Sequence, residues 1–318
     1  MAGVVGDMNF VVAKTVDFLK SLDFSTLTDK SVLITGGVSG LGALIATAFA
    51  EHGARVTVAD INEELGKNFV KQQTQLGSNL RFVRTDVTSW QSQIEAFKTA
   101  IRFSGHNGID IVVAAAGLSG DEFHSPDEEP SSLETDPPEP RIAGPTFDVN
   151  AKGVYFTAHL AKHYFHLPET APSSTDKAFR KSLILISSLA GYLEINAADY
   201  TASKWAVRGL FRSIRSRMED LGYRTNLIAP WVMDTPMSKG LASICRENGL
   251  PVGNAKHVAQ AVLRCAADDA ICGRAIAVGA TQPYDLNDDI EGMNAGIVMK
   301  DYLEGEAKEF MAFFGQRP

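Results

Sequence analysis

Cysteine is scarce in this chain of 318 residues, which has only three, Cys245, Cys265 and Cys272. So small and odd a number argues against a framework of disulfide bonds and fits a reducing compartment, so we expect a cytoplasmic protein. No apolar run approaches the roughly 18 residues that a membrane span requires. The first ten residues also lack the basic stretch that begins a secretory signal. The sequence therefore predicts neither a membrane protein nor a secreted one.

Basic residues are too few to balance the acidic ones: 30 Lys and Arg stand against 38 Asp and Glu, a formal net charge of -8. An acidic chain is a poor partner for nucleic acid, so we expect none. Most of the excess lies in residues 118–147, which hold eight acidic residues, one basic residue and six of the 13 prolines. Outside this acidic, Pro-rich insert the chain is close to neutral.

Apolar residues are plentiful, at 45% of the chain, which excludes wholesale disorder and allows a sizeable core. From residue 30 onward, short apolar runs alternate with longer amphipathic segments. The runs predict strands at 31–35, 55–60, 80–86, 109–116, 183–188, 225–229 and 275–278. The amphipathic segments predict helices at 41–52, 62–76, 89–103, 147–166, 199–221 and 255–267. This alternation predicts an α/β fold, a doubly wound parallel sheet of the Rossmann type, in a single domain over 30–280.

Two terminal segments fall outside the alternation. Residues 1–29 predict a helical extension docked on the domain, because apolar residues recur there at helical spacing: Met8, Val12, Val16, Leu19 and Leu22. Its mixed charges do not suit a helix lying on a membrane surface. Residues 281–318 form an acidic tail with a helix-like end, and we expect it to cover part of the domain or a subunit contact.

A glycine-rich stretch, Thr-Gly-Gly-Val-Ser-Gly-Leu-Gly at 35–42, joins the first predicted strand to the first predicted helix. Glycines allow positive φ and let backbone N–H groups approach a pyrophosphate at the positive end of a helix, which indicates a dinucleotide site. Asp60 ends the second strand, where a carboxylate accepts from ribose hydroxyls and repels a 2′-phosphate. The sequence therefore favours NAD over NADP, unless Asp60 is an ordinary strand-end cap.

The spacing of these glycines resembles that of the short-chain dehydrogenase/reductases, and the resemblance covers about residues 30–280. It implies cofactor contacts from Thr35, Gly36, Ser39, Gly40, Leu41 and Gly42, from Asp86 and Val87 after the third strand, and from Ala116 and Gly117. The stretch Ala-Ala-Ala-Gly at 114–117 stands where the family usually has Asn-Asn-Ala-Gly. The support that an asparagine side chain there gives the central sheet is therefore not expected.

The pair Tyr200 and Lys204 shares one face of a predicted helix, because the residues are four apart. A free phenol has a pKa of about 10, and a neighbouring ammonium favours its ionised form, so we expect Tyr200 to act as an acid and base. The resemblance adds that Lys204 holds the nicotinamide ribose and that Asn150 holds a water in a proton relay. It also implies that Ser188 binds the substrate oxygen, with Ser187 as the alternative.

After the sixth predicted strand, the resemblance implies that Pro230, Val232 and Thr235 hold the nicotinamide carboxamide. Trp231 replaces the family's glycine and places a large aromatic group near the nicotinamide. Residues 231–254 are the expected substrate loop, in which Met237 and Leu241 form part of an apolar wall that suits a hydrophobic substrate. The alternative is that this apolar wall packs against the tail.

No metal site is predicted, because the seven histidines show no partner pattern with Cys or acidic residues. His159, His163 and His166 recur at helical spacing and are interpreted as a helix surface or an interface. A serine hydrolase is not indicated either, because Ser188 does not lie in a Gly-x-Ser-x-Gly elbow.

These features predict an oxidoreductase that transfers a hydride between NAD(H) and a hydrophobic secondary alcohol or ketone, an intermediate of secondary metabolism. The chain is similar to fungal dehydrogenases of polyketide pathways and, more distantly, to 15-hydroxyprostaglandin dehydrogenases. A cyclase, dehydratase or isomerase on the same scaffold stays open, as does a protein that binds NAD without turnover. The resemblance also implies a homodimer or homotetramer formed through the helices at 147–166 and 199–221.

The position of the acidic insert carries one more expectation. It follows the fourth strand, and ligands of this fold bind at the carboxyl ends of strands. We therefore expect a loop beside the mouth of the active site that acts as a lid or a partner contact. A solvated decoration is the alternative.

Overall fold

A computed structural model describes residues 15–120, 123, 133, 143–168, 179–193, 195 and 197–288. Its centre is one eight-stranded sheet with the order β3-β2-β1-β4-β5-β6-β7-β8. The strands are β1 Ser31–Thr35, β2 Arg55–Asp60, β3 Leu80–Arg84, β4 Ile111–Ala114, β5 Ser182–Ile186, β6 Arg224–Pro230, β7 Ala275–Val278 and β8 Pro283–Asp285. The first seven are parallel, and β8 pairs antiparallel with β7. The predicted doubly wound parallel sheet is confirmed.

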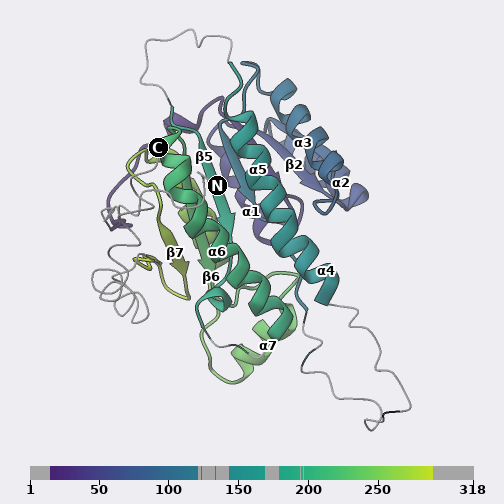
Figure 1. The fold of residues 1–318 in the computed structure, drawn as a ribbon, viewed down its shortest axis with the longest axis vertical. Coiled ribbons are helices and arrows are strands. Elements are labelled where there is room, and N and C mark those ends of the chain that lie inside the picture. The colour runs from purple at the N-terminus through teal and green to yellow at the C-terminus, as the bar shows by residue number, and fades with distance from the viewer. Residues whose placement is uncertain are drawn as a thin grey trace.

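Helices cover both faces of the sheet, which explains why its central strands are buried along their whole length. One layer contains α1 Gly40–Glu51, α2 Glu63–Gln75 and α8 Ala255–Ala267, and the other α3 Trp90–Phe103, α5 Val154–Tyr164 and α6 Ala198–Asp220. Figure 1 shows α5 and α6 crossing the near face of the sheet. Shorter elements are η1 Ser25–Leu27, α4 Ala143–Phe147, the π-helical η2 Asp148–Gly153, η3 Leu189–Gly191 and α7 Lys239–Glu247.

Helix starts follow their capping residues. The side chain of Asn62 accepts a hydrogen bond from the N–H of Leu65 at the start of α2, and Ser89 caps α3 in the same way. These caps explain why both helices begin where the amphipathic patterns do. No helix in the described part of the chain combines the length and the apolar character that a membrane span requires.

The predicted N-terminal helix is wrong for residues 15–24, which are not helical. Their backbone is bound by side chains from distant parts of the chain: the N–H of Val16 donates to Asp285 Oδ2 at 2.9 Å, and Arg264 donates to the carbonyls of Asp17 and Lys20. Such bonds replace those of a helix, while Phe18 and other apolar side chains pack against the core beside α8. Met8 and Val12 lie outside the described residues.

Two further predictions differ from the structure. The helix expected at 147–166 begins at Ala143 and passes through the π-helical turns of η2 before α5. In the predicted tail, residues 283–285 form the antiparallel strand β8. The rest of the tail from residue 289, and nearly all of the acidic insert between 121 and 142, lie outside the described residues.

Candidate active site

The predicted site residues gather at one end of the sheet. The glycine-rich stretch follows β1, residues 115–117 follow β4, Ser188 follows β5, and residues 231–235 follow β6. Because the carboxyl ends of parallel strands meet at the same edge, four separate segments converge there. Figure 1 shows α7 beyond the tips of β6 and β7 at this end of the molecule.

The glycine-rich stretch folds as a tight turn against β4. Gly36 has a φ of 66°, and a Cβ added to it would lie 2.6 Å from Cα of Ala116. A Cβ on Gly42 would lie 2.0 Å from the carbonyl oxygen of Gly36. The turn leads directly into α1, with the exposed Ser39 as its N-cap residue and Leu41 packed against the core. A turn of this shape, ending in the free N–H groups of a helix start, fits the pyrophosphate of a dinucleotide.

Asp60 connects β2 to this turn. Its Oδ2 accepts a hydrogen bond from the N–H of Val38 at 3.4 Å, and its Oδ1 accepts from the N–H of Asn62 at 3.1 Å. The carboxylate thus has a local capping role, as the alternative interpretation held. It is half-buried and each oxygen keeps a second acceptor site, so it also has the capacity to bind ribose hydroxyls.

The segment after β4 is held without the asparagines that the family usually has there. The hydroxyl of Thr35 accepts from the N–H groups of Ala115 at 3.2 Å and Ala116 at 3.4 Å. The amide of Asn150 accepts from the N–H of Leu118 at 2.7 Å and donates to its carbonyl at 2.9 Å. Thr35 from β1 and Asn150 from η2 therefore supply the support that the sequence did not lead us to expect.

Asp86 and Val87 have structural contacts beside the site. Asp86 Oδ1 accepts from the N–H and the hydroxyl of Thr88, at 2.9 and 2.8 Å. Val87 is buried against Gly153, and its carbonyl accepts from the side chain of Gln93 at 2.7 Å. Contacts of this pair with an adenine stay a prediction.

Ser188, Tyr200 and Lys204 come together between η3 and α6. The Ser188 hydroxyl donates to the carbonyl of Pro230 at 3.3 Å and lies close enough to the Tyr200 phenol to lower its pKa. Lys204 Nζ lies 5.4 Å from the centre of the Tyr200 ring. The Ser187 hydroxyl instead donates to the backbone carbonyl of Lys204 at 3.1 Å. The two serines thus have different partners, and the geometry favours Ser188 as the one beside the phenol.

Gly117 leaves a gap between Asn150 and Lys204. A Cβ added to Gly117 would lie 3.4 Å from Asn150 Oδ1 and 3.6 Å from Lys204 Nζ. Asn150 Nδ2 donates both to the Leu118 carbonyl and to Ser203 Oγ, the latter at 2.9 Å, so only its Oδ1 retains an acceptor site. The relay water expected at Asn150 stays a prediction.

Burial shifts the two titratable groups in opposite directions. It raises the pKa of Tyr200, against the smaller effect of the hydrogen bond from Ser188, which lowers it. It lowers the pKa of Lys204 to about 8, because an ammonium enclosed by protein loses its hydration. The pKa of the phenol therefore lies above its usual value in this structure and not below it, because burial raises it more than Ser188 lowers it.

The segment after β6 closes over the glycine-rich turn. A Cβ on Gly40 would lie 3.6 Å from Cβ of Thr235, and the carbonyl of Val232 accepts from the N–H of Gly253 at 2.8 Å. Trp231 is half-buried and packs against the core on both faces of the sheet. Its ring thus covers the end of the sheet, and its contact with a substrate stays a prediction.

Apolar side chains line the rim of this region. Cε of Met237 would lie 3.9 Å from a Cβ on Gly117, so this side chain lies beside the gap next to Lys204. Leu241 on α7 is 52% exposed, whereas Ala242 and Cys245 on the same helix are buried against the protein. Met237 therefore lies beside Lys204, and contact of Leu241 with a bound molecule stays a prediction. The alternative partner, the tail beyond residue 288, lies outside the described residues.

Two buried residues that sequence reasoning missed support the site. Ser203 accepts from Asn150 and donates to the carbonyl of Tyr200 at 2.6 Å. Gln93 on α3 donates to the Gly153 carbonyl at 2.9 Å and accepts from Thr157 at 2.8 Å, which fixes the end of η2. Ser203 adjoins Lys204 in the sequence, so its position was a usable signal, whereas nothing near Gln93 marks it.

Three histidines recur at helical spacing on and after α5. His159, His163 and His166 are exposed on α5 and just after it, as expected for a helix surface. Among the residues with described positions, no group of three His, Cys, Asp or Glu could hold a metal ion.

Comparisons with known proteins agree with this geometry. The model of the short chain dehydrogenase family matches residues 30–244. The 5′-hydroxyaverantin dehydrogenase of Dothistroma septosporum is 38% identical over 297 residues, which cover 89% of this chain and 95% of that protein. The Emericella nidulans protein of the same name is 38% identical over 280 residues, covering 85% and 90%. An NADP-dependent dehydrogenase of a Phoma species is 34% identical over 296 residues, covering 88% and 86%.

A similar solved structure is that of 3-ketoacyl-(acyl-carrier-protein) reductase from Brucella melitensis complexed with NADH. Its TM-score is 0.65 at 21% identity, over 80% of this chain and 99% of that one, and it supports the fold. The fungal relatives confirm the predicted similarity to fungal dehydrogenases of polyketide pathways. The similarity to 15-hydroxyprostaglandin dehydrogenases stays a prediction.

Proposed function

The chain belongs to the short-chain dehydrogenase family and is an oxidoreductase acting on CH–OH groups, and from this premise we propose that it transfers a hydride between NAD(H) and a secondary alcohol or ketone on an apolar substrate. One observation carries the proposal. Ser188 and Tyr200, with the buried Lys204 5.4 Å from the centre of the Tyr200 ring, lie at the same end of the sheet as the turn that fits a dinucleotide.

Each residue has a role in the proposed reaction. NAD, when bound at the glycine-rich turn, supplies the hydride acceptor. Tyr200 removes the proton from the alcohol oxygen in oxidation and returns it in reduction. Ser188 donates a hydrogen bond to the substrate oxygen, where negative charge develops. Lys204, as a buried cation, stabilises the ionised phenol, and Asn150 Oδ1 holds the water through which the proton reaches solvent.

The choice of NAD rests on Asp60. A carboxylate at the end of β2 accepts from ribose hydroxyls and repels a 2′-phosphate. Relatives whose names state NADP dependence make a direct comparison necessary. We expect turnover with NAD to exceed turnover with NADP when both are measured at equal concentrations.

The substrate class rests on the apolar rim. Met237 offers apolar surface beside Lys204, Leu241 is an exposed apolar residue of the nearby α7, and neither carries a group that would bind a charged substrate. Because two relatives are named for 5′-hydroxyaverantin, this compound is the first substrate to test, followed by other hydrophobic secondary alcohols.

The test is formation of reduced cofactor, followed by its absorbance, with a product that has lost two hydrogens. Tyr200→Phe should lower kcat at least about 100-fold, whereas Tyr155→Phe on the exposed face of α5 should not change it. Full turnover by Tyr200→Phe would contradict the mechanism. A product of unchanged mass would point to a non-redox reaction, and NAD binding without turnover of any substrate would point to a binding protein.

A further inference from the structure

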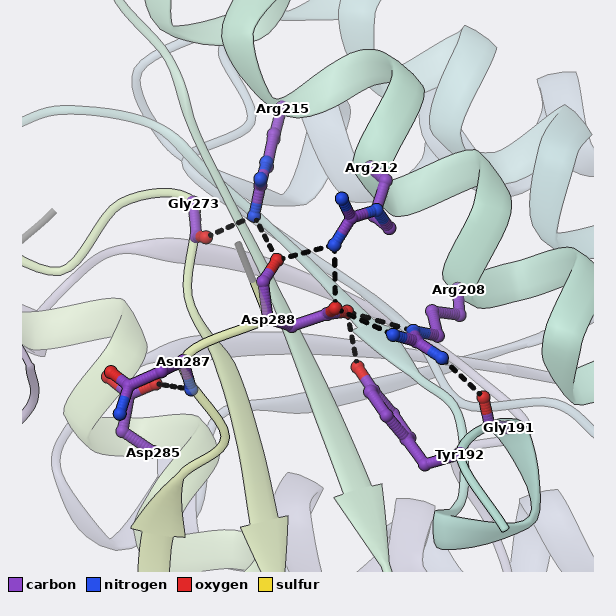
Figure 2. A network of polar contacts seen from close by, with 9 residues as sticks. All are labelled: Gly191, Tyr192, Arg208, Arg212, Arg215, Gly273, Asp285, Asn287 and Asp288. Carbon is purple, nitrogen blue, oxygen red and sulfur yellow. Dashed lines mark hydrogen bonds and ion pairs between the residues drawn. The ribbon is translucent and has the colours of Figure 1, made fainter. Parts of the chain in front are cut away.

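Asp288, the last residue of the described C-terminal segment, has a fully buried carboxylate (Figure 2). Its Oδ1 accepts from Arg208 and Arg212, at 2.8 and 2.7 Å. Its Oδ2 accepts from Arg208 Nε at 3.0 Å and from the Tyr192 hydroxyl at 2.8 Å. The backbone carbonyl of the same residue accepts from Arg212 and Arg215, at 2.8 and 2.9 Å. One residue thus satisfies donors from α6 and from the segment after η3.

The partners of Asp288 belong to the two elements that carry the proposed catalytic groups. Arg208 lies one helical turn after Lys204 on α6. Arg208 also donates to the carbonyl of Gly191 at 3.3 Å and stacks 4.0 Å above the ring of Tyr192. Figure 2 shows Arg208 between Asp288 and the turn that holds Gly191 and Tyr192.

That turn is η3, and Ser188 begins it. The Ser188 hydroxyl accepts from the N–H of Ala190 at 3.1 Å, and its carbonyl accepts from the N–H of Gly191 at 3.0 Å. A Cβ on Gly191 would lie 3.0 Å from the carbonyl oxygen of Lys204, so the turn is pressed directly against α6. A small movement of the turn along α6 would therefore change the position of Ser188 relative to Tyr200.

A buried ion pair is weak grounds for stability alone, because desolvation offsets most of the attraction between the charges. A pair of this kind does fix geometry well, since bidentate contacts with a guanidinium allow little freedom. The Asp288 contacts are bidentate with Arg208 and add a hydrogen bond from Tyr192. They thus hold the end of η3 at a set place on α6.

We propose that Asp288 is a positioning residue that, through Arg208 and Tyr192, holds the Ser188 turn in register with Tyr200 on α6. This role rests on the proposed function, in which Ser188 and Tyr200 act on the substrate oxygen. The role connects Asp288, which lies 80 residues after Arg208 in the sequence, with the relative position of Ser188 and Tyr200.

The proposal has a signature that loss of stability alone would not give. The Ser188 hydroxyl beside the phenol lowers its pKa, so a displaced Ser188 makes Tyr200 harder to ionise. Lys204 lies beside that phenol, and Arg208 and Arg212, the ion-pair partners of Asp288, lie further along the same helix. The pH profile is therefore read from Tyr192→Phe, which displaces the turn without a change of charge. The rise of the alcohol oxidation rate with pH should therefore move to higher pH.

The experiment compares Asp288→Asn with Asp285→Asn. Asp285 is a matched control, because its side chain is also fully buried and also forms a bidentate pair, with Arg274 at 2.8 Å. Both variants should unfold at lower temperature. Asp288→Asn should also lower kcat about 10-fold and leave the KM for NAD unchanged. Asp285→Asn should keep the kcat and the pH profile of the unchanged chain.

A milder variant covers the case in which Asp288→Asn does not fold. Tyr192→Phe removes only the hydrogen bond to Asp288 and keeps the ring against Arg208, so it should move the pH profile to higher pH and lower kcat by less than Asp288→Asn does. Superimposed pH profiles for Tyr192→Phe and Asp285→Asn, with equal kcat, would overturn the positioning role. Full turnover by Tyr200→Phe, measured alongside, would instead overturn the proposed function and the positioning role with it.

Discussion

Burial favours the neutral forms of both Tyr200 and Lys204, the two titratable groups of the site. The Lys204 ammonium is enclosed by protein, with a hydrogen bond from Nζ to the Ile186 carbonyl at 3.3 Å. Its pKa is about 8 in the folded chain against the ordinary value of 10.5, so the unfolded chain binds the proton more strongly. The buried charge therefore lowers the free energy of unfolding, and the proposed reaction uses this charge.

Lys204→Met should make the protein more stable and inactive. The shift in pKa corresponds to about 3 kcal/mol, reduced by the hydrogen bond that is lost, so the free energy of unfolding at pH 7 should rise by about 1–3 kcal/mol. Since the folded pKa is the lower one, the stability of the unchanged chain should itself rise between pH 8 and 10.5, and the gain from the substitution should disappear over that range. Urea denaturation at a series of pH values measures this. Lys152→Met, at an exposed ion pair with Asp148, is the control. A less stable Lys204→Met protein would contradict the argument.

Gly42 and Gly209 provide a second comparison at the scale of single residues. Both lie inside helices, but a Cβ on Gly42 meets the carbonyl oxygen of Gly36 at 2.0 Å, whereas one on Gly209 meets no atom within 4 Å. Gly42→Ala should lower the free energy of unfolding by about 1–3 kcal/mol and weaken NAD binding, because the turn must open. Gly209→Ala should raise the free energy of unfolding by about 0.5–1 kcal/mol. Denaturation together with cofactor titration tests both, and equal effects of the two substitutions would refute the role given to the turn.

The sequence predicted the site where its members are near neighbours along the chain. Tyr200 and Lys204 share a helix face whatever the rest of the fold does, and the glycine-rich turn lies between adjacent elements. The contacts of Asp288 with Tyr192 and Arg208 join residues 80 to 96 positions apart, and no local pattern specifies such a pair. The effect of burial on the pKa of Tyr200 was unpredictable for the same reason, because it depends on what the whole fold places around the ring.

At the scale of elements, the C-terminus of α8 is closed by a side chain from β6. The guanidinium of Arg224 is fully buried and donates to the carbonyls of Cys265, of Ala266 at 2.6 Å and of Asp268 at 3.1 Å. The last carbonyls of a helix have no partner within it and carry the negative end of its dipole, so a cation there satisfies both needs.

Arg224→Lys should therefore destabilise the protein although it keeps the charge. An ammonium cannot reach carbonyls on several sides, and each buried acceptor left without a donor lowers stability, for a total of about 2–4 kcal/mol. Chemical denaturation measures the loss, with the exposed Arg217→Lys at the end of α6 as the control. Equal denaturation midpoints for the two variants would show that the cap contributes little.

The sequence predicted helices and strands correctly where a single local pattern determines the element. Strands such as β1 and β5 are continuous apolar runs because they are covered on both faces. Strand β8 was missed because its three residues carry no such pattern and pair only through the edge of β7. The helix predicted in the N-terminal extension is wrong at residues 15–24. The apolar residues there recur at helical spacing, but side chains from distant parts of the chain bind the backbone instead.

At the scale of the whole molecule, the two ends of the described chain are joined. Thr15 donates to Asn287 at 3.1 Å, and Val16 donates to Asp285, whose carboxylate is also bound by Arg274. Apolar side chains of the N-terminal segment cover the core beside α8. The segment thus supports the side of the sheet opposite α6 and makes no described contact with the catalytic groups.

Deletion of residues 1–24 should lower stability and spare catalysis. Loss of the apolar contacts of Val16, Phe18, Leu22 and Phe24 should reduce the free energy of unfolding by about 2–4 kcal/mol, while kcat stays near that of the full chain. Thermal unfolding and steady-state rates measure the two effects. Deletion of residues 1–14, measured alongside, separates the contribution of residues 15–24 from that of the preceding residues. A large fall in kcat with unchanged stability would contradict this division of roles.

The order of the strands also limits how copies of this chain can meet. One edge of the sheet is β3, which carries the exposed charges of Arg81 and Arg84, and the other is the three-residue β8, whose Pro283 has no N–H to offer. Charges and proline at an edge discourage pairing with a further strand. The homodimer or homotetramer that the sequence predicts through the α5 and α6 helices stays a prediction, but growth of one sheet through several subunits is disfavoured at both edges.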